Sequence, residues 1–265
     1  MAEQKDVMRT RIWLEEPERD DPFSARSAHC HGYDVHGAMV GQARWVEMLY
    51  LLLRGEAPSR EQADLLEALA VALANAGPRD AAVHAAMCGG VGGSTAASCL
   101  IAALAVGAGQ LGGGREVFLA MQRWAECGTD LQAWQAALEA PAAPVASIWP
   151  TPERPPGFEP HGLRAAGTVL ATLSRLASIG CGPHLPWLGE FRPLLERHAG
   201  HPLAMSGVAA AALADLGFTP DQGEMLHLLL RLPGAAAHAL EQRELGHKQF
   251  PFFRIELDHD SEVMA

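Results

Sequence analysis

The sequence has little of the material from which β-sheets are built. Isoleucine occurs five times and tyrosine twice, and alternating runs of valine, isoleucine or threonine are nearly absent. Branched and aromatic side chains fill most strands, because they pack well on a pleated surface. Alanine and leucine, which favour helices, dominate instead. The composition excludes a large sheet and predicts a nearly all-α fold.

The chain also lacks a basic excess, paired cysteines and a long apolar run. A net charge of -11 argues against nucleic acid, whose phosphates need clustered lysine and arginine. The five cysteines are odd in number and widely spaced, and no apolar signal region opens the chain, so we expect a reduced, cytoplasmic protein. The longest apolar stretch, residues 96–108, contains Ser98 and is shorter than the about 20 residues that cross a bilayer. We expect no membrane contact.

Helix boundaries can be located from the sequence. Ser59 with Gln62, and Thr219 with Gln222, have the spacing of capping boxes that begin helices. Glycines at 217 and 246 are placed to end the helices before them. Between residues 139 and 162 the prolines are too dense for a helix, which predicts a connecting or functional loop.

Two kinds of ligand site are rejected. The cluster of histidines and a cysteine near the N-terminus lacks a second group to complete four ligands, so we expect no metal site; its members are His29, Cys30, His31 and His36. The glycine-rich stretches 89–93 and 107–114 have neither the preceding strand nor the acidic residue of a dinucleotide fingerprint. Close helix packing, or backbone near a ligand, explains them better.

Near the C-terminus, Arg231 precedes Leu-Pro-Gly-Ala-Ala-Ala-His, which predicts an arginine before a turn and then a helix. This run resembles the arginine-bearing signature of the citrate synthase superfamily, in which the arginine binds a substrate carboxylate. Residues 32–59, with Gly-Tyr-Asp, Tyr-Leu-Leu-Leu and Gly-Glu-Ala-Pro-Ser, resemble the family's N-terminal helices. A surface arginine that bridges helices is the alternative for Arg231.

The proline-rich loop ends Pro-Pro-Gly-Phe-Glu-Pro-His-Gly, which is similar to the family's Pro-Gly-Phe-Gly-His-Pro with one residue inserted. The resemblance implies that His161 polarises the substrate keto or hydroxyl oxygen, although a solvated loop histidine is equally consistent with the sequence. Arg164 is a looser match to the arginine that follows, at the start of a helix expected over residues 164–177. His184 lies in a similar run, but too close to Ser206, and ranks second.

Three polar positions of the family pattern are not kept. The resemblance places Gly89 where a substrate-binding histidine stands, and Gly112 where a histidine bonds the thioester oxygen. The citryl-CoA lyase portion of ATP-citrate lyase also lacks histidine at the second place. Ser206 replaces the aspartate that removes the α-proton of acetyl-CoA. A hydroxyl is no base at neutral pH. General acid–base catalysis typically raises a reaction rate by about a hundred- to ten-thousand-fold, so the loss of the aspartate should slow enolisation strongly.

The resemblance implies an α-helical citrate synthase-like fold with a large domain, residues 1–114 and 211–265, and a small inserted domain, residues 115–210. It further implies a homodimer formed through helices such as the one near residues 94–109. Near the C-terminus, Phe250 replaces the arginine that reaches the partner's site, and Arg254 is the substitute.

Two functions are consistent with this pattern, and they differ in whether the protein is catalytically active without the aspartate. The leading one is an acyl-CoA-dependent carbon–carbon lyase or synthase, citryl-CoA lyase-like or citrate synthase-like, with no bound cofactor and a coenzyme A thioester as substrate. The alternative is a catalytically inactive homologue that serves as a ligand-binding or partner subunit. A purely structural helical protein is disfavoured by the retained Gly-Phe-x-x-His and Arg-x-Pro-Gly stretches.

Overall fold

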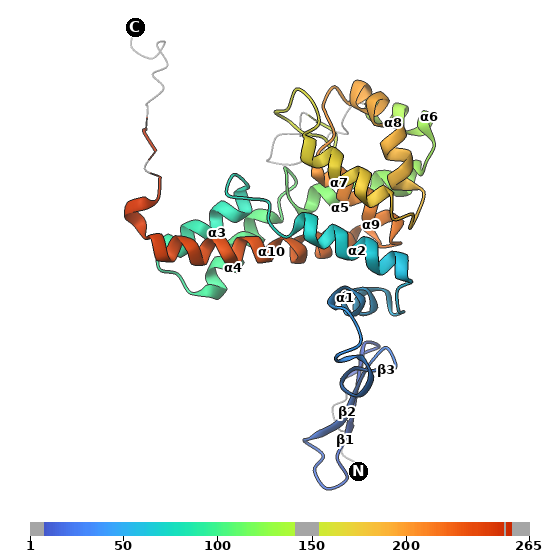
Figure 1. Cartoon of the computed structure of the whole chain (residues 1–265), viewed down its shortest axis with the longest axis vertical. Helices are drawn as coiled ribbons and strands as arrows, with labels where there is room; N and C mark the ends of the chain where they lie inside the picture. The colour runs from blue at the N-terminus through green and yellow to red at the C-terminus, as the bar shows by residue number, and fades with distance from the viewer. Residues whose placement is uncertain (1–7, 141–153, 252, 256–265) are drawn as a thin grey trace, which may run out of the picture. The chain divides into compact units, whose positions relative to one another are not determined.

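The computed structural model describes residues 8–140, 154–251 and 253–255, and in those ranges the chain is mostly helical. Much of the proline-rich segment, residues 141–153, lies outside the described residues. The nearly all-α prediction is confirmed. The helices are α1 (Trp45–Arg54), α2 (Arg60–Leu73), α3 (Ala81–Val91), α4 (Ala96–Gly107), α5 (Gly114–Cys127), α6 (Leu131–Glu139), α7 (Gly167–Ala177), α8 (His184–Ala199), α9 (Met205–Asp215) and α10 (Pro220–Leu245), with η1 (Val35–Met39) and η2 (His247–Gln249) as shorter turns (Figure 1).

The chain divides into two compact units. The first comprises Met1–Ala74 and Ala108–Leu230, and the second comprises Asn75–Gly107 and Arg231–Ala265. The boundary falls within α10. This grouping differs from the large and inserted domains that the resemblance implies, and that division stays a prediction.

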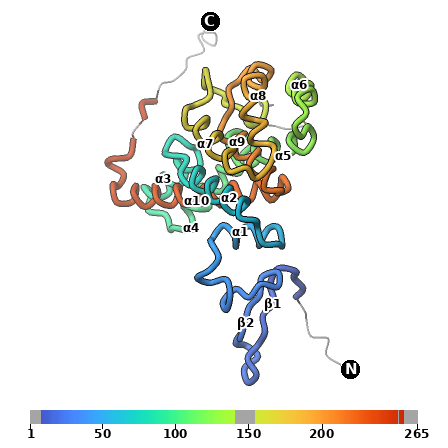
Figure 2. Tube along the Cα trace, turned by 45° about the vertical axis from the view of Figure 1, so that its right-hand side comes forward, coloured from blue at the N-terminus to red at the C-terminus, as the bar shows by residue number. Residues whose placement is uncertain are grey.

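The core of the first unit is built around α9, whose residues 207–213 are all buried. A helix that is apolar on every side must be surrounded, and its run of alanines lets neighbours approach closely. Helices α5, α7 and α8 pack against it (Figure 2). Leucines of α2 at 65, 66 and 69 have no exposed surface and extend the same core.

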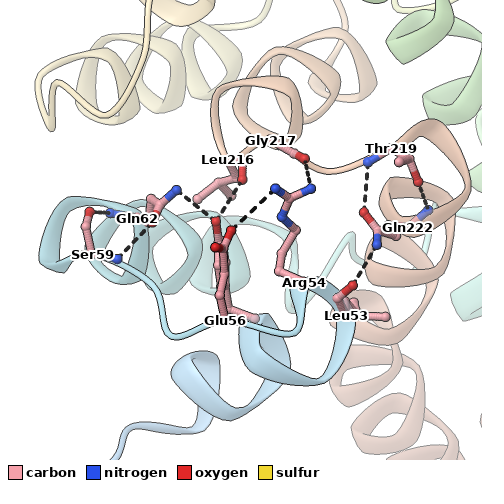
Figure 3. A network of polar contacts seen from close by, with 10 residues as sticks. Leu53, Arg54, Glu56, Ser59, Gln62, Leu216, Gly217, Thr219 and Gln222 are labelled. Atoms are coloured by element: carbon pink, nitrogen blue, oxygen red, sulfur yellow. Dashed lines mark hydrogen bonds and ion pairs between the residues drawn. The ribbon is translucent and has the colours of Figure 1, made fainter. Parts of the chain in front are cut away.

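Polar contacts fix the ends of these helices, as the sequence indicates. The side chains of Ser59 and Gln62 cap α2 reciprocally, and Thr219 and Gln222 do the same at α10. Gln222 also donates from Nε2 to the carbonyl oxygen of Leu53, 2.6 Å away, which joins α10 to α1 (Figure 3). Both predicted capping boxes are confirmed.

A glycine with a left-handed backbone conformation follows the end of α9. Gly217 has φ 75° and its carbonyl accepts from the Arg54 guanidinium, while Tyr50 Oη donates to the Leu216 carbonyl at 3.2 Å (Figure 3). Gly246, with φ 71°, ends α10. Both predicted helix stops are confirmed.

A small antiparallel sheet precedes the helices. Strand β1 (Trp13–Pro17) pairs with β2 (Ala25–Cys30), and β2 pairs with the short β3 (Tyr33–Asp34). The sequence does not indicate β2, because Ala-Arg-Ser-Ala-His-Cys contains no branched or aromatic residue. Backbone pairing to β1 defines this strand.

In the second unit, α3 and α4 pack together with the C-terminal part of α10 (Figure 1). A methyl group on Gly90 would overlap the carbonyl oxygen of Ala239, so α3 and α10 approach as closely as glycine permits. Arg243 Nη2 donates to the Ser94 carbonyl at 2.9 Å. Gly90 of the 89–93 stretch therefore has a packing role.

Two helix expectations need correction. No turn follows Arg231, because α10 continues through Pro233 to Leu245. Proline removes one backbone donor and disfavours a helix interior, but Leu230 before it and Ala235 after it are buried. Helix α7 begins at Gly167, three residues later than expected. No helix in the described ranges is both long enough and apolar enough to cross a membrane.

Substitution of Gly90 tests the packing of the second unit. Gly90→Ala should lower the free energy of unfolding by about 1–3 kcal/mol, the usual cost of overpacking, because the Ala239 carbonyl has no room to move away. Urea denaturation followed by circular dichroism measures this. Gly189→Ala is the matched control, since a methyl group on that helical glycine meets nothing within 4 Å. The control should gain up to about 1 kcal/mol; equal effects would contradict the close approach.

Candidate active site

The loop that resembles the family signature, residues 155–162, lies against the N-terminus of α9. We call it the family-like loop. Gly157 accepts from the Ala204 N–H at 3.0 Å, and the Glu159 N–H donates to the Pro202 carbonyl at 2.7 Å. These bonds flank an isolated antiparallel bridge between Phe158 and Leu203, both buried. The loop is thereby held beside the first turn of α9, which contains Ser206.

One buried carboxylate, Glu116, joins the separate family-like segments. Arg154 makes a bidentate pair with it, Nη1 to Oε1 at 3.0 Å and Nη2 to Oε2 at 2.9 Å. Gly157 N–H and Ser206 Oγ donate to Oε1 at 3.0 and 2.7 Å. Gly112 N–H donates to Oε2 at 2.6 Å. We call Glu116 and these four donor residues the Glu116 cluster.

The position of Glu116 explains its charge. It is in the first turn of α5, whose unpaired backbone N–H groups favour a negative charge, and it is only 1% exposed. Burial by itself raises the pKa of this carboxyl, but the hydrogen bonds from Arg154, Ser206 and Gly112 outweigh it, so the pKa lies below its ordinary value. Glu116 is therefore ionised at neutral pH.

The cluster is a poor source of general-base catalysis. A carboxylate that already accepts five hydrogen bonds and pairs with arginine has a lowered proton affinity and is a weaker base. The Ser206 hydroxyl donates a hydrogen bond to Glu116 and is no base itself. An aspartate at position 206 would instead put two carboxylates side by side. A serine at this position avoids that repulsion and donates a hydrogen bond to Glu116 instead.

The backbone explains the two glycines that replace histidines in the family pattern. Gly112 has φ 77°, a left-handed conformation that a histidine would adopt only with strain. A Cβ on Gly89 would lie 3.0 Å from Cys99 Sγ, where α3 meets α4. Restoring histidine at either position would disturb the local fold.

The structure places the predicted loop residues at the surface. His161 and Arg164 are exposed, and the His161 N–H donates to Glu159 Oε1 at 3.3 Å. Gly162, the next residue, lies beside Pro202, so His161 is close to the segment that leads into α9. The proposed role of His161 remains a prediction.

The other predicted ligand contacts belong to the second unit. Arg231 pairs with Asp80, whose other oxygen accepts from the N–H groups of Ala82 and Val83 at the start of α3. Arg254 is exposed. Their proposed ligand contacts remain predictions, and an arginine that bridges helices describes the observed contact of Arg231.

His184, the second-ranked candidate, serves helix α8. Its Nδ1 lies 2.8 Å from Asp215 Oδ1, and the same carboxylate accepts from the backbone N–H groups of His184 and Leu185. The Asp215 side chain has no exposed surface and caps α8 from the end of α9. The His184 ring packs edge-on against Trp124. This is a structural contact.

Sequence reasoning missed Glu116 and Arg154. Glu116 is the acidic residue in the first turn of an otherwise apolar stretch, Val-Phe-Leu-Ala-Met, a pattern that usually means a solvated cap. Arg154 precedes the family-like loop by one residue. Only the contact between segments 38 residues apart shows that they form a pair.

No protein-family model and no curated protein sequence matches this chain. Solved structures do. Citryl-CoA lyase from Hydrogenobacter thermophilus superposes with a TM-score of 0.71 at 17% identity, over 96% of this chain and 97% of that one. The chain has a citrate synthase-like fold. The predicted fold is thus confirmed.

ATP citrate lyases share this fold. The enzyme from Methanothrix soehngenii, in complex with citrate and coenzyme A, superposes with a TM-score of 0.71 at 16% identity. A variant from Methanosaeta concilii, in complex with (3S)-citryl-CoA, gives 0.69 at 14% identity. Each match covers 98% of this chain but 43% of the lyase, so the chain corresponds to one part of those larger proteins.

Neutralising Glu116 tests its electrostatic role. Glu116→Gln should lower the free energy of unfolding at neutral pH by about 3–5 kcal/mol, because Arg154 stays buried without its partner charge. The pKa of Glu116 is lowered in the folded state from 4.5. Its stabilisation is therefore complete above that pH and is lost as the pH falls through the lowered value. The difference between wild type and variant should shrink on acidification, measured by urea denaturation at several pH values.

Two further variants serve as controls for the Glu116→Gln measurement. Glu67→Gln, on the exposed face of α2, should change stability by less than about 0.5 kcal/mol at any pH. Glu116→Gln combined with Arg154→Met should cost less than the sum of the single changes, because neither charge is then left alone. Additive losses that do not vary with pH would contradict the pairing.

Proposed function

We propose that the chain is a citryl-CoA lyase-type protein that binds a coenzyme A thioester of a di- or tricarboxylic acid and cleaves its carbon–carbon bond. The observation that carries the proposal is the shared fold along nearly the full length of both this chain and the Hydrogenobacter citryl-CoA lyase. The two ATP citrate lyase structures add citrate, coenzyme A and (3S)-citryl-CoA as ligands of proteins that share this fold.

In the proposed reaction, a base removes the proton of the citryl hydroxyl group, and that oxygen becomes the keto oxygen of oxaloacetate as the carbon–carbon bond breaks. The electron pair of the bond passes to the thioester enolate, which takes a proton at carbon and leaves as acetyl-CoA. His161 would accept the hydroxyl proton. Arg231 would hold a substrate carboxylate, with Arg164 and Arg254 as further contacts.

The Glu116 cluster implies slow chemistry. Removal of a carbon-bound proton needs a strong base, and neither Ser206 nor the hydrogen-bonded Glu116 offers one. Cleavage and synthesis pass through the same transition states, so the missing base and the missing thioester donor at Gly112 slow both directions alike. We therefore propose a slow enzyme, whose direction is set by the concentrations of its substrates and products.

The hydrogen bonds that Glu116 accepts leave it a weak base, and this favours a second candidate function. If the site contains no working base in either direction, the same fold serves as a ligand-binding or partner subunit. A homodimer, a cytoplasmic location and the absence of a bound cofactor belong to both proposals and stay predictions.

The two functions differ in one pair of assays. The lyase should release oxaloacetate from (3S)-citryl-CoA, read as NADH oxidation by added malate dehydrogenase. It should not exchange the methyl protons of acetyl-CoA with deuterated water beyond the uncatalysed rate, because enolisation needs the missing base.

Calorimetric titration with coenzyme A, acetyl-CoA, oxaloacetate and citrate completes this test. Binding without release of oxaloacetate would support the subunit, and neither binding nor release would reject both functions. Rapid proton exchange would mean that another residue has replaced the aspartate. Proton exchange by nuclear magnetic resonance thus tests the assignment of Ser206.

The role of Arg231 can be separated from its contact with Asp80. Arg231→Ala should weaken citrate binding by roughly 1.5–3 kcal/mol, the range for a hydrogen bond to a charged group. Asp80→Ala is the matched control, because it removes the same ion pair and the α3 cap but leaves the arginine. Its cost should appear in thermal stability and not in affinity. Equal stability losses with unchanged affinity would make Arg231 a purely structural residue.

A further inference from the structure

The Glu116 cluster has the composition of a carboxylate-binding site. Its donors are a guanidinium, a hydroxyl and two backbone N–H groups, and they come from the start of α5, the family-like loop and the start of α9. Planar arginine pairing with backbone N–H groups is a common way for proteins to bind a carboxylate ligand. Here the occupant is a side chain of the same protein.

Without that occupant the donors carry an unbalanced positive charge. The Arg154 side chain is 9% exposed, and its ion pair with Glu116 neutralises it. Ser206 is in the first turn of α9, where backbone N–H groups add positive potential. A buried cation without a counter-charge is costly, so the site requires an anion.

The backbone around the donors cannot easily close into the space of a missing anion. A Cβ on Gly207 would clash with the Gly157 carbonyl, and Gly157 itself has φ 91°. The loop and α9 therefore already meet at the shortest distance that two glycines allow. Removal of the Glu116 side chain should therefore leave a space among the donors that a small anion can occupy, because the loop and α9 cannot approach further to fill it.

We propose that Glu116 acts as an internal carboxylate ligand that positions the loop carrying His161, and that a free monocarboxylate such as acetate can replace it. Glu116 fastens the loop at Arg154 and Gly157, and the backbone pairing to residues 202–204, just before α9, then continues to Glu159, two residues before His161. What the loop needs from Glu116 is its anionic carboxylate group. The consequence for turnover rests on the proposed lyase function, whereas the anchoring does not.

The test uses Glu116→Ala in sodium acetate and in sodium chloride at equal ionic strength. Hydrogen exchange of residues 154–162 reports the loop directly, because the amides of Gly157 and Glu159 are bonded in the wild type. In chloride the variant should lose loop protection and melt at lower temperature than the wild type. Acetate should restore both in a saturable way. The wild type should behave alike in both salts.

Two further variants sharpen the result. Glu116→Ala with Arg154→Met should gain nothing from acetate, because the bidentate donor is gone. Glu116→Gln should gain nothing either, because its side chain still fills the position. If Glu116→Ala does not fold in chloride, refolding from urea in acetate against chloride gives the same comparison. Equal behaviour of Glu116→Ala in the two salts, in stability or in refolding yield, would overturn the proposal.

Citryl-CoA cleavage separates this proposal from the proposed function. If the wild type is active, kcat of Glu116→Ala should fall roughly ten- to a hundredfold with little change in KM, since a displaced catalytic group slows turnover. Acetate should restore kcat together with loop protection. Unchanged kcat in a variant with an unprotected loop would overturn the positioning role. An inactive wild type rejects the lyase function alone, and hydrogen exchange still decides the anchoring.

Discussion

The first unit depends on the neutralisation of one buried charge. Glu116 has almost no exposed surface, and it remains ionised because Arg154 and the N-termini of two helices surround it. The same carboxylate connects the start of α5, the loop at residues 154–157 and the start of α9. Three segments that are distant in sequence meet at a single functional group. The arrangement is polar, although alanine and leucine make up most of the surrounding core.

The fold was largely predictable from the sequence because its signals are local. Capping boxes at Ser59 and Thr219 and glycine stops at 217 and 246 act within one helical turn, and each is present. The prediction of a turn after Arg231 was wrong. Proline usually ends a helix, but α10 continues through Pro233, where Leu230 and Ala235 are buried on either side. Strand β2 was missed for the opposite reason: its residues have no strand preference, and only its pairing with β1 defines it.

The candidate site was less predictable because its chemistry depends on long-range pairing. Gly112 and Ser206 looked like losses from a catalytic pattern, and the structure adds a physical reason for each: a left-handed backbone and a hydrogen bond to Glu116. Neither Glu116 nor Arg154 stands out by spacing or by neighbours. A charged residue in a helix's first turn is normally solvated, and burial cannot be read from one sequence.

The contact between Gly157 and Gly207 bears on how this fold changes during evolution. Each glycine is required by the backbone of the other, so a substitution at one would have to be accompanied by separation of the two segments. Both glycines are thus requirements of the architecture and not of the reaction. The Pro-Gly-Phe stretch of this chain is accordingly a mark of its fold rather than of its activity.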